Sequence, residues 1–223
     1  MAHYMLSLYQ YQLLKVRLMN LFTKFLLISC TLLSSTAHSV TITTFTDSAL
    51  WEAAVSSYSQ EDFEMSPSVT ASQAGDTFTL DDFEIVIDKN HGSIEIDSSG
   101  TGPIIGGTKS FFGDVHSVGG TEPQFQTLNF FNDISAFAAD FAEGDADGIT
   151  LHVLGQSLPI TFSGITFFGF ISDTAFSSVN ITGGSTGSGF YVMDNVKFVP
   201  EPSALLLFSL GLIGFGFIRK SAK

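Results

Sequence analysis

The central part of the chain, residues 38–199, alternates short runs of β-branched and aromatic residues with clusters of turn-forming residues. Several runs place apolar side chains at every second position, as in Phe83, Ile85 and Ile87. A period of two is typical of a strand that buries one face. Many short strands separated by glycine-rich turns predict an all-β domain, and we expect an antiparallel β-sandwich.

One helix is expected near the start of this domain, with Asp47 as its N-cap. Leu50, Trp51, Ala54 and Val55 follow at helical spacing and are predicted to face the sheets. The strands are expected at Val40–Thr44, Thr77–Leu80, Phe83–Asp88, Ser93–Asp97, Gln126–Phe130, Ile134–Phe141, Gly148–Val153, Ser157–Phe162, Thr166–Ser172, Phe176–Thr182 and Gly189–Phe198.

Charge is distributed unevenly along the chain. Residues 38–199 contain three lysines against 21 acidic residues, a formal charge of −18. This field repels phosphate backbones and so excludes a nucleic-acid partner. The acidic surface also keeps a domain rich in phenylalanine soluble. A single cysteine, Cys30, excludes a disulfide framework.

The N-terminus has the order of a secretory signal peptide over residues 1–37. Lys24 precedes an apolar run over residues 25–33, and small residues follow up to Ala37, where cleavage is expected. Met19 is an alternative start that retains this order. A second interpretation remains open, because residues 27–30 also fit a lipoprotein box in which Cys30 is acylated.

The C-terminus, residues 200–223, reads as a membrane anchor. Pro200, Glu201 and Pro202 come first, an uncharged apolar stretch covers residues 204–218, and Arg219 and Lys220 follow. As a helix this stretch is about 22 Å long, short of the ~30 Å hydrocarbon core. We expect a transmembrane helix that spans the bilayer either with help from Phe198 or by local thinning of the bilayer. The terminal cations act as a cytoplasmic stop and leave residues 38–199 outside.

This tripartite tail resembles the PEP-CTERM sorting signal of Gram-negative bacteria, which has its motif, apolar helix and basic cluster in the same order. The resemblance implies sorting and cleavage by an exosortase in the inner membrane, after export by the secretion machinery. It also implies a cell-surface or extracellular location in bacteria that make exopolysaccharide or biofilm. An unprocessed C-terminal anchor is the alternative.

The central domain is also similar to jelly-roll carbohydrate-binding modules. The likeness rests on an early Phe63-Glu64 pair, the run 167–172, and a late Asp194-Asn195-Val196 in the last strand. It implies a jelly-roll-like sandwich in which Glu64 and Asp194 hold a structural calcium ion. Their carboxylate oxygens suit calcium, although calcium needs six to eight oxygen ligands.

Catalytic signals are weak. The letters G-x-S-x-G at residues 183–187 lack a later histidine and a following helix, so we interpret them as a turn. Phe111 and Phe112 stand in a loop-like region and are the expected contacts to a sugar ring. Acidic pairs such as Asp81 with Asp82, or Glu61 with Glu64, would serve a glycoside hydrolase if folding placed them ~5–9 Å apart.

Three functions follow from these patterns. The preferred one is a non-enzymatic exported protein of the cell surface or extracellular matrix that binds exopolysaccharide or has a structural role. The first alternative is a secreted hydrolase that acts on polysaccharide. The second alternative is a lipoprotein anchored through Cys30.

Overall fold

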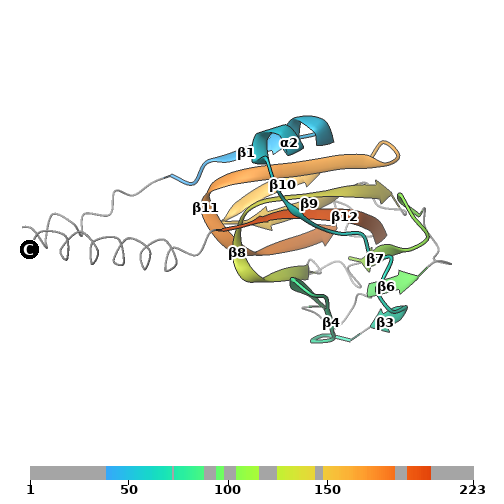
Figure 1. Ribbon diagram of the computed structural model, residues 1–223. Helices are drawn as coiled ribbons and strands as arrows, with labels where there is room; N and C mark the ends of the chain where they lie inside the picture. Colours follow the sequence, from blue (N-terminus) through green and yellow to red (C-terminus); the bar gives the residue numbers. More distant parts are fainter. Residues whose placement is uncertain are drawn as a thin grey trace, which may run out of the picture. The chain divides into compact units, whose positions relative to one another are not determined.

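The structure is a computed structural model (Figure 1) that describes residues 39–71, 73–87, 94–97, 104–115, 125–143, 148–183 and 190–201. The chain divides into two compact units, Met1–Ser39 and Val40–Lys223. The predicted signal peptide, with Met19 and Cys30, lies outside the described residues. So does the predicted transmembrane helix beyond Glu201. The account below concerns the β domain.

The described residues form an all-β domain with one short helix, as the sequence predicts. Every strand pairing among them is antiparallel. The elements are β1 (Ile42–Phe45), α2 (Ser48–Val55), β2 (Ser59–Glu61), β3 (Val69–Ala71), β4 (Thr77–Thr79), β5 (Phe83–Ile87), β6 (Ile94–Asp97), β7 (Ser110–Asp114), β8 (Phe125–Glu143), β9 (Ile149–Val153), β10 (Gln156–Ile160), β11 (Thr166–Gly183) and β12 (Phe190–Pro200).

The strands share one continuous hydrogen-bonded network whose main order is β10-β9-β11-β8-β12-β7-β6-β3. Three branches leave this path: β1 pairs with β11, β2 pairs with β12, and the β4–β5 hairpin pairs with β8 through β5. The last strand, β12, therefore lies between β8 and β7 and also contacts β2.

Two long strands, β8 and β11, bend and contribute to both layers of the fold (Figure 1). The first part of β8 pairs with β5 and with the end of β11, and its second part pairs with β12 and with the start of β11. The register between β11 and β8 shifts between Ile171 and Phe176 and again before Ser178. The sequence predicts two strands at each of these places, because polar residues interrupt the apolar period where the strand bends.

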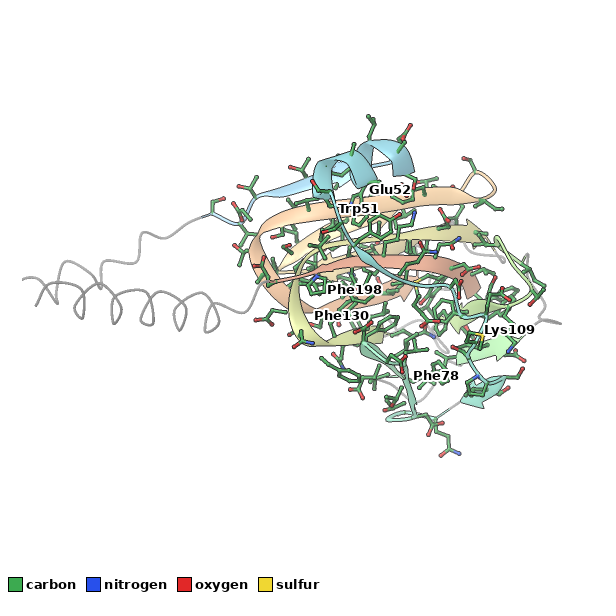
Figure 2. The ribbon with its side chains drawn as sticks, viewed as in Figure 1. Trp51, Glu52, Phe78, Lys109, Phe130 and Phe198 are labelled. Carbon is green, nitrogen blue, oxygen red and sulfur yellow. The ribbon has the colours of Figure 1, made fainter. Side chains whose placement is uncertain are left out.

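Aromatic side chains fill the space between the layers. Phe130 is in ring contact with Phe198 at 5.2 Å and with Phe83 at 5.2 Å (Figure 2). Phe137 and Phe170 lie 5.7 Å apart, and both are fully buried. Burial of this many rings supplies the main favourable free energy of folding.

The helix α2 covers the outer face of the bend. The Asp47 carboxylate accepts the backbone N–H of Leu50 at 3.1 Å, which confirms the predicted N-cap. Trp51 is fully buried and packs over Ala136 and Ala138 of β8. Leu50 is 64% exposed and Ala54 is exposed as well, so the prediction that these two residues face the sheets is wrong. A helix of two turns set against a curved sheet buries a narrower stripe than its spacing suggests.

Candidate functional site

Glu64 ties the loop of residues 104–109 to the segment that follows β2. Its Oε1 accepts the backbone N–H groups of Thr108 and Lys109 at 2.6 and 3.0 Å, and its Oε2 accepts the Thr108 hydroxyl at 2.6 Å. These bonds, the one from the Thr108 hydroxyl first, lower the pKa of Glu64. Lys109 strengthens the link, because its Nζ donates to the carbonyl oxygen of Ser66 at 2.6 Å.

Two glycines allow the loop to lie against these side chains. A Cβ at Gly107 would overlap Oε1 of Glu64. Gly106 has a φ of +76°, and a Cβ there would stand 3.1 Å from Nδ2 of Asn195. The loop therefore needs glycine at one position for close approach and at the other for a left-handed backbone.

Asp194 of β12 faces the same loop from the other side. Its side chain is buried, with Oδ1 accepting the backbone N–H of Asn195 at 2.7 Å and Oδ2 facing the Ser110 hydroxyl at 3.4 Å. The Ser110 oxygen in turn accepts the backbone N–H of Ile105 at 2.9 Å. Burial raises the pKa of Asp194 to about 7, and the negative charges of Asp62 and Glu64 add to the rise.

The structure thus brings Glu64 and Asp194 to one loop, where the resemblance to carbohydrate-binding modules places a calcium ion. Their oxygens have the right chemistry, but each carboxylate already accepts hydrogen bonds from the protein. Within residues 39–201 as far as they are described, no group of three or more His, Cys, Asp or Glu side chains is placed to hold a metal. The donor set does not fit calcium as it stands, so we expect no calcium at Glu64 and Asp194 in this arrangement, and a calcium titration tests that expectation.

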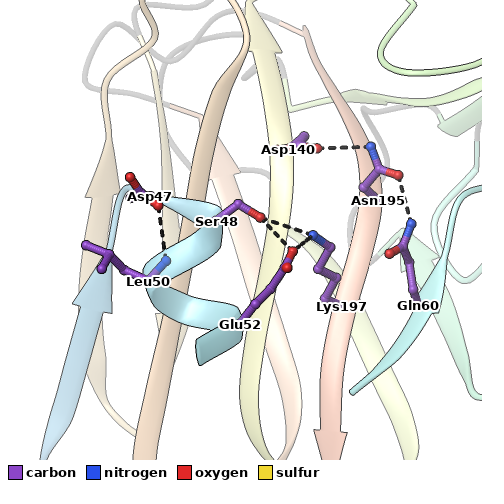
Figure 3. Close-up of polar contacts among 8 residues, drawn as sticks. All are labelled: Asp47, Ser48, Leu50, Glu52, Gln60, Asp140, Asn195 and Lys197. Carbon is purple, nitrogen blue, oxygen red and sulfur yellow. Dashed lines mark hydrogen bonds and ion pairs between the residues drawn. The ribbon is translucent and has the colours of Figure 1, made fainter. Parts of the chain in front are cut away.

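Asn195 marks a bulge next to Asp194. Its φ is +50°, and the β12–β8 register shifts between Asp194 and Lys197. Its Nδ2 donates to the Asp140 carboxylate at 2.9 Å, and its Oδ1 accepts from Nε2 of Gln60 at 2.9 Å (Figure 3). The amide therefore links β8, β12 and β2 at the point where the backbone ladder is interrupted.

Lys197, two residues further along β12, points to helix α2. Its Nζ lies 2.6 Å from Oε1 of Glu52 and 3.2 Å from the Ser48 hydroxyl (Figure 3). The same ammonium stands 5.4 Å from the ring centre of Tyr58 and 5.8 Å from that of Phe167. Sequence reasoning missed this cluster, although a lysine between apolar residues of a strand, here Val196 and Phe198, is a signal for a buried ion pair.

Phe111 and Phe112, the predicted sugar contacts, lie in strand β7 rather than in a loop. Phe111 is fully buried and packs against the ring of Tyr191, and Phe112 is 6% exposed. Neither ring has a free face for stacking, so this prediction is wrong. The sequence predicts a loop here because the run is short and follows Gly106 and Gly107, and because β7 buries consecutive residues rather than every second one.

Two of the acidic residues considered for hydrolysis, Glu61 and Glu64, accept hydrogen bonds from the protein. Oε1 of Glu61 accepts the backbone N–H of Phe63 at 2.7 Å. Burial raises the pKa of Glu61, and the negative charges of Asp62, Asp81 and Asp82 raise it further. Asp81 and Asp82 therefore lie near Glu61, whereas Glu64 is engaged with the loop of residues 104–109.

The proposed sorting motif begins inside the fold. Pro200 is the last residue of β12 and pairs with Ile134, and the backbone N–H of Glu201 donates to the carbonyl oxygen of Asp133 at 2.8 Å. Pro202, Arg219 and Lys220 lie outside the described residues. In the part of the chain that the structure describes, no helix is long and apolar enough to cross a membrane.

Comparison with known proteins gives little for the β domain. No curated protein matches the chain. Among solved structures, one match is the crystal structure of the enzymatically active domain of tailspike protein 4 of bacteriophage CBA120. The two sequences are 11% identical, and the TM-score is 0.30. The match covers 61% of this chain and 20% of the tailspike chain.

The tail, in contrast, matches a family model. The model describes the PEP-CTERM protein-sorting motif and covers residues 198–220. The match includes Pro200, Glu201 and Pro202 and extends through the apolar stretch to Arg219 and Lys220. The chain therefore carries a PEP-CTERM protein-sorting motif at its C-terminus, which marks an exported protein sorted through an exosortase.

Proposed function

We propose that this chain is a non-enzymatic protein of the cell surface or extracellular matrix, released from its membrane anchor by an exosortase. The observation that carries the proposal is the sorting motif at residues 198–220, which continues directly from the last strand of the β domain. In this proposal the tail delivers the β domain and the β domain performs the role outside the cell.

The role proposed for the β domain is binding or support of extracellular polysaccharide. Its charge supports a neutral glycan over an acidic one, because residues 38–199 carry a formal charge of −18. Four of the side chains considered for hydrolysis or sugar stacking, Glu61, Glu64, Phe111 and Phe112, are engaged in the fold, and this supports a structural or binding role. A secreted hydrolase and a lipoprotein anchored through Cys30 remain the alternatives.

Localisation tests the delivery step. The full chain is produced in a Gram-negative host that has an exosortase, and cytoplasm, membranes and medium are separated. We expect the wild type at the cell surface or in the medium, with His38 as its first residue. The control replaces Pro200, Glu201 and Pro202 with alanine and should stay in the membrane fraction. Wild-type protein retained in the cytoplasm would contradict the proposal, and an acylated Cys30 would support the lipoprotein.

Binding tests the role of the β domain. Mature protein recovered from the medium is incubated with exopolysaccharide from the same host and with an acidic polymer of similar length, such as alginate. We expect the protein to be retained on the host exopolysaccharide where this polymer is neutral, and not on alginate. We also expect no release of shorter sugars. Release of reducing ends would instead establish the hydrolase.

A further inference from the structure

The sorting motif overlaps the hydrophobic core of the β domain. The match begins at Phe198, which is 2% exposed and contacts the rings of Phe83 at 6.0 Å and Phe130 at 5.2 Å (Figure 2). Its first residue is therefore a core residue of the sandwich and cannot be part of a free linker.

The next residues of the motif are held by their backbone. Val199 pairs with Ala136 and Pro200 with Ile134 across the β12–β8 ladder. Proline has no N–H group, so the ladder continues through Glu201, whose N–H donates to the carbonyl oxygen of Asp133 at 2.8 Å. The side chains of Pro200 and Glu201 are exposed while their backbone is engaged.

An enzyme that cuts a peptide bond binds its substrate as an extended strand through main-chain hydrogen bonds. Upstream of Glu201, an enzyme that binds the chain in this way would need the backbone N–H and C=O groups that already pair with β8. Detaching the chain as far as Val199 also pulls on Phe198, and exposing a buried phenylalanine costs about 1.5–3 kcal/mol. Cutting a peptide bond that follows Glu201 does not require β12 to be detached from β8.

The distance to the apolar stretch limits the site from the other side. Only Pro202 and Ser203 stand between Glu201 and Ala204. Three residue steps at ~3.3–3.6 Å span about 10 Å at most. The sequence thus leaves only a short segment between the end of β12 and the apolar stretch for an enzyme in the membrane.

We infer that the sorting enzyme cuts on the C-terminal side of Glu201, so that Pro200 and Glu201 remain on the mature protein as the end of β12. The inference rests on the proposed function, because it requires that the tail be cut. In the simplest form of the step, water adds to the carbonyl carbon of the broken amide. The domain then ends in a new carboxyl group, and the released tail begins with a new amino group.

The first test maps the mature C-terminus by mass spectrometry of protein recovered from the medium of the exosortase-bearing host. We expect every mature chain to end at Glu201 or at a later residue. A mature end at Pro200 or earlier overturns the inference and leaves the proposed export intact. A chain that keeps its whole tail overturns both the processing step of the proposed function and the inference.

The second test separates the protection by β8 from the specificity of the enzyme. The full-length chain in detergent is treated briefly with a broad-specificity protease such as proteinase K. We expect the wild-type domain fragment to end at or after Glu201. Four residues, Gly-Ser-Gly-Ser, inserted between Val199 and Pro200 should move the cut into the insert. The control carries the same insert between Ser203 and Ala204 and should retain Glu201 on the domain. Wild-type domain fragments that end before Glu201 would overturn the inference.

Discussion

Nζ of Lys197 lies 2.6 Å from Oε1 of Glu52, and this contact joins the last strand to the helix near the start of the domain (Figure 3). The lysine is mostly buried, whereas the glutamate is partly exposed. The contact holds α2 over the outer face of β8 and β11, where Trp51 is buried.

We expect Lys197→Met to lower the urea midpoint of unfolding more than Glu52→Gln does, because the methionine variant loses the donor to both Glu52 and Ser48. The double variant should be less destabilised than the sum of the single variants, since the two residues interact. The ion pair lowers the pKa of Glu52. Its contribution is therefore present above the ordinary value of 4.5 and is lost as the pH falls below it. Additive effects at pH 7 would show that the pair has no coupling energy.

Trp51→Ala is expected to lower the free energy of unfolding by about 3–5 kcal/mol, because it empties a fully buried site on β8 and β11. The indole Nε1 also loses its bond to the carbonyl oxygen of Phe170, which it makes at 3.3 Å. Leu50→Ala is the matched control on the same helix and should change stability by less than about 0.5 kcal/mol. Equal losses in urea unfolding would contradict the placement of α2.

Asp194 should make the stability of the domain depend on pH. Its pKa is raised from 3.8 to about 7, so between these values the folded protein keeps a proton that the unfolded chain has released. Its stabilising contribution is full below about pH 4 and is lost as the pH rises through 7. We expect Asp194→Asn to flatten the profile of melting temperature over this range. The matched control is Asp133→Asn, which makes the same substitution at an exposed position, and flattening that both variants share is not due to Asp194.

Gly107→Ala should break the contact between Glu64 and the loop of residues 104–109, because the added methyl group overlaps Oε1 of Glu64. A loss of about 1–3 kcal/mol is expected from the overlap. In a Glu64→Ala background the same glycine substitution should cost much less, since the colliding carboxylate is gone. Urea unfolding of the four proteins measures the difference, and equal costs in both backgrounds would contradict the contact.

Calcium is tested on the same residues. The oxygens of Glu64 already accept three hydrogen bonds from the loop, so we expect added calcium to leave the melting temperature unchanged. The test uses about 1 mM calcium, which is ~100-fold above a Kd of about 10 µM. A bound ion at this excess would stabilise the protein by about 2.7 kcal/mol. A calcium-dependent rise that disappears in both Glu64→Gln and Asp194→Asn would establish the predicted ion.

The alternation of apolar and polar residues is enough to predict the strands that bury one face. The alternation in residues 83–87 appears in the structure as β5, with Phe83, Ile85 and Ile87 inward. Strands β2, β3 and β7 escaped prediction because β2 and β3 have three residues each and β7 follows a glycine-rich turn. Such short segments form strands because they pair with other strands in the folded domain, and their own sequences show no alternation that would predict a strand.

The candidate site divides in the same way. Short motifs predict Glu64 and Asp194 as a pair, and the structure places both against one loop. There, Thr108 and Lys109 donate hydrogen bonds to Glu64, and the Ser110 hydroxyl faces Asp194. The exposure of Phe111 and Phe112 was misjudged because burial depends on the layers that close over β7.

By itself the sequence determined the class of fold, the acidic character of the domain and the sorting motif, because periodicity, charge and an ordered tail are all local properties of a chain. Tertiary structure alone decided that Lys197 meets Glu52, that β8 and β11 each bend through both layers, and that Glu201 is bonded to Asp133. These contacts join residues far apart in sequence, and their energies arise only when folding removes the intervening water.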